Sequence, residues 1–160
     1  MKLKYVDLGS NVLEFVNVPV ACPVTYELLG KPDAHHLFTI EDSDLGLLVS
    51  ADLRDKDSNP IVKITKNEIE KLDDKYKTNG VIGESESFKV IRKEDNVVMF
   101  DVKTIHDSIK VTGYFYFGGR EYSITENEVL ILPEHIRLRG NLKRTSGNCG
   151  IVFSGYSLAM

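Results

Sequence analysis

The stretch IKVTGYFYFGGREYSI (Ile109–Ile124) carries the pattern that decides the fold. Apolar and polar side chains alternate through its first nine residues, as in a strand with one buried face. Gly113 falls in line with the apolar set, which indicates a bulge or a close backbone contact. The alternation resumes after Gly118 and Gly119, and two such runs across a Gly-Gly pair predict a β-hairpin. The predicted core set is Ile109, Val111, Phe115 and Phe117, and the opposite face carries Lys110, Thr112, Tyr114 and Tyr116.

The same pattern recurs along the chain. FKVIRKEDNVVMFDV (residues 88–102) predicts two strands around a polar turn at 93–96, and ENEVLILPEHIRLRGN (residues 126–141) predicts two strands that meet at Pro133. CGIVFSGY (residues 149–156) is a further short strand. Residues 3–8, 12–18 and 24–29 are also expected strands, between prolines that favour sheet edges or irregular crossings.

The stretch LVSADLRDKDSNPIVKI (residues 48–64) allows two interpretations. Asp55, Asp57 and Asn59 have the spacing with which a calcium-binding loop begins. An EF-hand loop, however, needs glycine at its sixth position and glutamate at its twelfth, where this chain has Pro60 and Lys66. Asp, Ser, Asn and Pro are also the residues that turns select. We therefore predict a hairpin turn here and no metal site.

One segment departs from the period of two. In TKNEIEKLDDKYKTNG (residues 65–80), Glu68 stands three residues after Thr65, which is the spacing of a helix capping box. Ile69, Leu72 and Tyr76 follow at helical spacing. This pattern predicts a short helix over about residues 66–78.

The expected fold class is therefore mainly β: an antiparallel β-sandwich or an irregular barrel with that one short helix. A length of 160 residues favours a single domain over residues 1–160, in which the prolines make residues 1–36 a possible irregular strand segment.

Composition narrows the class of protein. With 42% hydrophobic and 28% charged residues, the chain is globular, and its net charge of −4 disfavours a protein that coats nucleic acid along its whole surface. Two cysteines favour a reducing compartment. The N-terminal segment lacks the apolar core of a signal peptide, and no apolar run reaches the ~20 residues that span a bilayer. We expect a cytoplasmic protein with no membrane partner.

No motif for catalysis is present. The sequence contains no phosphate-binding loop and no nucleophile elbow. His35 and His36 are adjacent without a third ligand, His106 and His135 stand alone, and Cys149 has no marked base nearby. We predict no catalytic residue, no metal site and no cofactor, so binding is favoured over enzymatic activity.

Two surfaces are candidates for binding. Basic residues gather near the C-terminus, where an arginine ladder on a strand face could bind phosphates or an acidic partner. A tyrosine-rich face is suited to a protein interface, because tyrosine is apolar along its ring and polar at its tip. The anion-binding or nucleic-acid-binding candidates are Arg120, Arg137, Arg139, Lys143 and Arg144, and the interface candidates are Tyr114, Tyr116 and Tyr122.

These surfaces support two hypotheses about function. The first is a non-catalytic interaction module that binds a protein partner, or a second copy of itself as a homo-oligomer, through exposed sheet faces. The alternative is a small nucleic-acid-binding or anion-binding protein, or an enzyme, that uses the basic segment 135–144. The alternative requires that segment to share one cleft with His106, His135 and Cys149.

Overall fold

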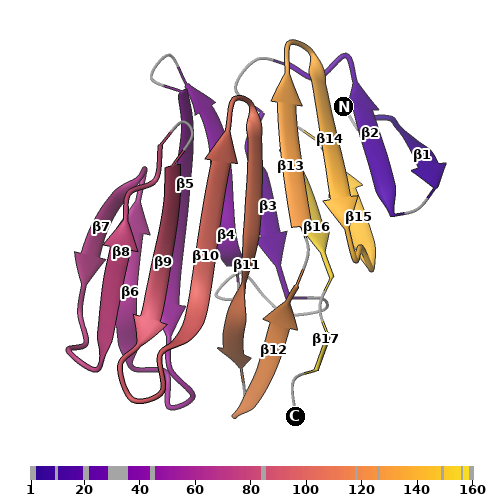
Figure 1. The fold of residues 1–160 in the computed structure, drawn as a ribbon. Coiled ribbons are helices and arrows are strands. Elements are labelled where there is room, and N and C mark those ends of the chain that lie inside the picture. Colours follow the sequence, from indigo (N-terminus) through magenta and orange to yellow (C-terminus); the bar gives the residue numbers. More distant parts are fainter. Residues whose placement is uncertain are drawn as a thin grey trace.

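A computed structural model shows two β-sheets that face each other across a common core (Figure 1). The structure describes residues 3–9, 11–19, 22–28, 36–43, 46–83, 86–117, 119–125, 127–148, 150–155 and 157–158. The two sheets remain separate, so the fold is a sandwich and not the barrel that the sequence also allowed.

Sheet A is the ten-stranded sheet. Eight of its strands lie side by side in the order β1 (Tyr5–Gly9), β2 (Val12–Val16), β14 (His135–Gly140), β13 (Asn127–Leu132), β11 (Ser108–Phe117), β10 (Val97–Ile105), β9 (Glu86–Arg92) and β8 (Tyr76–Gly80). The other two are β12 (Arg120–Ile124), which pairs with the far end of β11, and β17 (Ser157–Leu158), which pairs with β12.

Sheet B is the seven-stranded sheet. Its order is β15 (Arg144–Gly147), β16 (Ile151–Ser154), β3 (Val24–Glu27), β4 (His36–Ser43), β5 (Gly46–Arg54), β6 (Pro60–Thr65) and β7 (Glu68–Lys71). β16 and β3 are parallel, and the other described pairings in both sheets are antiparallel.

The core lies between the two sheets and forms one continuous cluster. In sheet B, the ring of Tyr26 stacks on Phe38 at 5.2 Å and meets the edge of Phe153 at 4.7 Å. In sheet A, Phe100 and Phe115 meet edge to face at 6.0 Å. Aromatic pairs in these geometries stabilise a core beyond the area they bury.

The alternation in the opening stretch is confirmed, because Ile109, Val111 and Phe115 are buried while Lys110 and Tyr114 are exposed. The hairpins of β9 with β10, β11 with β12 and β13 with β14 all form. The close backbone contact expected at Gly113 is also present. A Cβ atom at this position would lie 2.8 Å from the carbonyl oxygen of Met99, closer than two such atoms can approach.

The stretch around Asp55 is a turn, as predicted, and it joins β5 to β6. The Asp55 carboxylate accepts hydrogen bonds from the backbone N–H groups of Asp57 and Asn59, both at 2.9 Å. The side-chain amide of Asn59 donates to the same carboxylate at 3.3 Å. The oxygens that resemble calcium ligands in the sequence therefore hold the turn of the hairpin.

The helix predicted over about residues 66–78 is wrong. Residues 68–71 form β7 and residues 76–80 form β8. Lys66 and Asn67 have left-handed backbone angles, with φ of 47° and 70°, and make a two-residue turn between β6 and β7. A type I′ hairpin turn requires positive φ at both of these positions.

Asn67 is the physical reason for this turn. Its Oδ1 accepts from the N–H of Val49 at 2.7 Å, and its Nδ2 donates to the carbonyl of Leu47 at 2.9 Å. Its own N–H donates to the carbonyl of Val49 at 2.9 Å. The turn therefore bonds backbone groups of β5 that lie beyond the end of β6. A helix at these residues would leave those groups of β5 without partners.

No α-helix occurs in the described part of the chain. Accordingly, none of those residues forms a helix that could cross a membrane.

The contacts of Asn67 predict a large effect of its substitution. N67A should lower the free energy of unfolding by about 1–3 kcal/mol more than N96A, because it leaves the buried N–H of Val49 without an acceptor. Asn96 is the matched control, since it also has a positive φ, 60°, in a hairpin turn. Urea unfolding of both variants measures the difference, and equal losses would contradict the bonding role of Asn67.

Candidate functional site

Sheet A divides at one end of β11. The pairing of β10 with β11 runs from Ile105–Ser108 to Phe100–Gly113, and no described pair continues it past Gly113. Beyond this point β11 pairs with β12, from Gly113–Ile124 to Phe117–Arg120. The segment Tyr114–Phe117 therefore follows β12 and leaves β10.

A cleft of about 530 Å³ opens where the two strands separate. Its rim carries Asp52, Arg54, Ser58, Tyr114 and Tyr116. Its inner wall is apolar and comes from both sheets: Leu28, Leu37, Leu53, Ile61, Val90, Met99, Phe115 and Phe117. The cleft thus reaches the interior of the sandwich, and residues of both sheets border it.

A second cavity of about 510 Å³ borders the first, and Tyr116 lines both. The lining of the second cavity is charged. Its cationic residues are Lys56, Lys75, Arg92 and Lys93, and its anionic residues are Asp55, Asp57, Asp73 and Glu94. The site therefore combines an apolar cleft with an adjacent polar surface that has no net formal charge.

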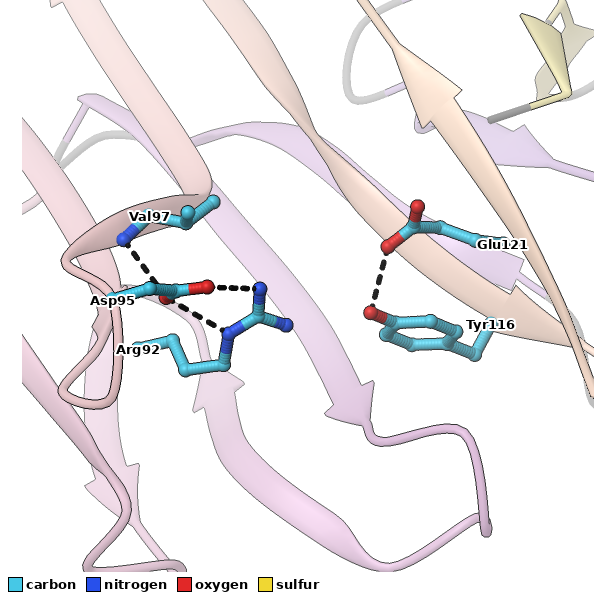
Figure 2. A network of polar contacts seen from close by, with 5 residues as sticks. All are labelled: Arg92, Asp95, Val97, Tyr116 and Glu121. Carbon is cyan, nitrogen blue, oxygen red and sulfur yellow. Dashed lines mark hydrogen bonds and ion pairs between the residues drawn. The ribbon is translucent and has the colours of Figure 1, made fainter. Parts of the chain in front are cut away.

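Figure 2 shows the Arg92 side chain, from β9, and the Tyr116 side chain, from β11, pointing toward each other. Asp95 fixes the Arg92 guanidinium with hydrogen bonds from Nε at 3.0 Å and Nη2 at 2.6 Å (Figure 2). The Tyr116 hydroxyl donates to Glu121 at 2.7 Å. These contacts hold Tyr116 in place at the rim of the cleft and Arg92 in place in the adjoining cavity.

The electrostatics follow from these contacts. The hydrogen bond from Arg92 lowers the pKa of Asp95, and the same contact raises the pKa of Arg92. Burial raises the pKa of Tyr116 to about 12, with a further contribution from Glu121, while Arg92 opposes the shift. At neutral pH, Tyr116 is therefore a protonated hydrogen-bond donor and Arg92 a cation.

The tyrosine face is present only in part. Tyr114 and Tyr116 lie on the predicted face and line the cleft. Tyr122 does not share this face, because the register pairs it with Phe115 and leaves it 8% exposed. The same register places Glu121 opposite Tyr116, so Tyr122 belongs to the core side.

The basic candidates do not form one surface. Arg137 on β14 is held by Glu14 on β2, with a shortest distance of 2.6 Å, and Arg144 on β15 in sheet B pairs with Glu27. Arg139 lies on β14, Arg120 begins β12, and Lys143 precedes β15. The strand face with Arg137 and Arg139 opposite buried Ile136 and Leu138 forms as predicted.

Glu14 neutralises part of the arginine ladder. Besides Arg137, it contacts Nδ1 of His135 at 3.1 Å. The hydrogen bonds from Arg137 and then His135 lower the pKa of the Glu14 carboxyl, so it stays ionised at neutral pH. An anion that binds Arg137 would have to compete with this carboxylate.

The remaining candidates are dispersed. His106 lies in the two-residue turn between β10 and β11, as its position predicted, and has a φ of 54°. His135 begins β14. Cys149 and His35 lie outside the described residues, and so does the side chain of His36. The described lining of the two adjoining cavities includes no histidine or cysteine.

Comparison with protein-family models, with curated proteins and with solved structures gives no match for this chain. The function is therefore argued from the geometry of the site.

Sequence reasoning missed Arg92, Glu121 and the apolar wall of the cleft. Arg92 ends β9, where it looks like the polar start of a turn. Glu121 could have been found, because the hairpin that the sequence predicts at the Gly-Gly pair would place it opposite Tyr116, as the register does. The apolar wall of the cleft could not have been found from the sequence, because Leu53 and Met99 follow the same alternation as ordinary core residues.

The raised pKa of Tyr116 predicts a pH dependence of stability. The unfolded tyrosine ionises near 10.0 and the folded one near 12, so the stabilisation is complete below pH 10 and is lost as the pH rises toward 12. Y116F should make this decline shallower, and E121Q should lower the midpoint at which Tyr116 ionises. Urea unfolding and ultraviolet titration across this range measure both effects. If the free energy of unfolding of Y116F fell with pH as steeply as that of the wild type, the decline could not be assigned to Tyr116.

Proposed function

We propose that the protein is a non-catalytic protein-binding module that takes an extended segment of a partner polypeptide into the cleft between β10 and β11. The observation that carries this proposal is the end of the β10–β11 ladder at Phe100–Gly113, directly above an apolar cavity. The sequence led us to expect binding through exposed sheet faces. The proposal is more specific, because it names one opening in one sheet.

The backbone of β11 supports an extended ligand. In an antiparallel ladder, a strand offers its N–H and C=O groups alternately to its two neighbours. From Tyr114 to Tyr116 the neighbour on one side is β12, and no described strand pairs on the other. An extended peptide can pair with such an edge, which supplies affinity through main-chain hydrogen bonds.

The side chains around the cleft support alternating recognition. Side chains of a bound strand point alternately to its two faces. One set would enter the apolar cavity, whose volume of about 530 Å³ lies within the range typical of binding pockets. The other set would meet Tyr114 and Tyr116, residues that are enriched in protein interfaces.

The rim favours a polar or charged group at one end of the ligand. Arg54 pairs with Asp52 at 3.1 Å beside the first cavity, and Arg92 faces the second. The Arg54–Asp52 pair is exposed, so it contributes little to stability and Arg54 can exchange partners, whereas Asp95 holds Arg92 in place. The preferred segment therefore has alternating apolar residues followed by a charged residue.

Selection from a library of short random peptides tests this proposal. Recovered binders should carry apolar residues at alternate positions, and Y114A should weaken their binding by about tenfold or more. Y5A is the matched control, since Tyr5 is 45% exposed and Tyr114 39%. Binders that tolerate Y114A and shift backbone amide resonances outside β10, β11 and β5 would overturn the proposal.

We propose that both activities, peptide binding and self-association, take place in the cytoplasm, because the cysteine content is low.

Self-association through β1 is a second candidate for partner binding. β1 is the edge strand of sheet A, and all five of its residues are exposed, including Tyr5, Val6 and Leu8. An exposed edge strand with apolar side chains is a template for pairing with another chain. Two copies could pair antiparallel through β1 around a two-fold axis.

Light scattering coupled to gel filtration tests this edge. V6K should convert a dimer to a monomer, because a lysine on an edge strand opposes edge-to-edge pairing. V81K is the control, since Val81 is 55% exposed and Val6 53%. A monomeric wild-type protein at high concentration, or equal effects of both variants, would rule out the β1 interface.

A further inference from the structure

The chain contains a single Asn-Gly pair, Asn79 and Gly80. The pair ends β8, which is the edge strand of sheet A at the opposite end from β1. Both residues are exposed, and the side chain of Asn79 makes no hydrogen bond with any residue that the structure describes. Asparagine is a chemically labile residue. Here its side-chain amide is unpaired, and the glycine that follows has no side chain to keep the backbone away from it.

The strand register directs the N–H group of Gly80 away from the sheet. The N–H of Lys93 donates to the carbonyl of Lys75 at 3.0 Å, and from this pair the register of β8 with β9 continues without a shift to the end of β8. Hydrogen-bonded and non-hydrogen-bonded pairs alternate in an antiparallel ladder. By this alternation the pair Asn79–Lys89 is hydrogen-bonded and the pair Gly80–Phe88 is not. The N–H of Gly80 therefore points away from β9, to the side on which no described strand pairs with β8.

Two other exposed asparagines lack this arrangement. Asn96 is followed by Val97, whose N–H already donates to Asp95 Oδ1 at 3.2 Å. The β-branched side chain of Val97 also crowds its own backbone nitrogen. Asn59 is followed by Pro60, which has no N–H group. Neither asparagine therefore has an available backbone nitrogen beside its side-chain amide.

We propose that Asn79 and Gly80 form a site of spontaneous deamidation and isomerisation, at which water is the only co-reactant. The backbone nitrogen of Gly80 loses its proton and attacks Cγ of Asn79. A C–N bond forms and closes a succinimide ring, the bond from Cγ to the side-chain nitrogen breaks, and that nitrogen takes up the proton and leaves as ammonia. Water then adds to either carbonyl of the ring, which opens to aspartate or to isoaspartate.

The two products have different effects on β8. Aspartate at position 79 adds a negative charge directly opposite Lys89, and opposite charges in this position stabilise a sheet. Isoaspartate instead adds a methylene group to the main chain next to Gly80. The backbone has no room there for a shift toward β9, since a Cβ atom on Gly80 would lie 2.0 Å from the carbonyl oxygen of Ser87. Isoaspartate therefore separates the end of β8 from β9 and draws Ile82, which is 9% exposed, out of the core.

Incubation of the folded protein at mildly alkaline pH, followed by mass spectrometry of its peptides, tests the proposal. The peptide with Asn79 should lose its amide before any other, faster as the pH rises, and should give two acidic products of equal mass. N79Q should abolish this loss, because the longer side chain closes a ring far more slowly, and N96Q should leave it unchanged. Earlier loss at Asn96, or an intact Asn79 in the folded protein where the urea-unfolded protein is converted, would overturn the proposal.

A second comparison separates the new charge from the change in the main chain. Freshly purified N79D carries the charge alone, so its urea midpoint should equal or slightly exceed that of the wild type. The isoaspartate form, separated from the incubated protein by chromatography, should unfold at a lower urea concentration than N79D. An isoaspartate form as stable as N79D would overturn the effect proposed for the end of β8.

Discussion

The backbone of Gly113 lies so close to Met99 and Phe100 that any side chain would meet the carbonyl oxygen of Met99 at 2.8 Å. This contact fixes the last pair of the β10–β11 ladder. Immediately beyond it, β10 shifts register between Val98 and Phe100, and β11 turns away with β12. The cleft, its apolar wall and the position of Tyr116 all depend on this single close approach, since pairing that continued here would close the sheet over the cavity.

The polar groups that border the cleft and the adjoining cavity are held by contacts that do not involve the core. Arg92 is fixed by the turn residue Asp95, and Tyr116 is fixed by Glu121 on the neighbouring strand. Side chains that are already ordered lose less conformational entropy when a ligand arrives. The alternation of β11 contributes at the same time, because it buries Phe115 in the wall and directs Tyr114 and Tyr116 to the rim. One strand thus supplies both the apolar and the polar part of the site.

Much of the fold follows from local pattern. The period of two identified the buried faces, Gly113 marked a close contact, and the turn at Asp55 was recognisable from its own side chains. The predicted helix failed because the capping-box spacing of Thr65 and Glu68 coincides with a two-residue turn, and the contacts that decide between them are to Leu47 and Val49 on β5. The site was predictable only on β11. Its other half, Arg92 and the wall residues of β5 and β6, comes from strands whose proximity depends on the packing of two sheets.

The two halves of β11 explain why the proposed binding site lies at one end of this strand. From Ser108 to Gly113 the strand has neighbours along its length, so its outer face is a flat sheet. From Tyr114 onward it pairs with β12 and opens toward the core. The first half can hold only what rests on the surface. The second half gives access to apolar volume, and there an extended chain can bury side chains. Because Gly113 separates the halves, a ligand on the second need not disturb the hydrogen bonds that form the first.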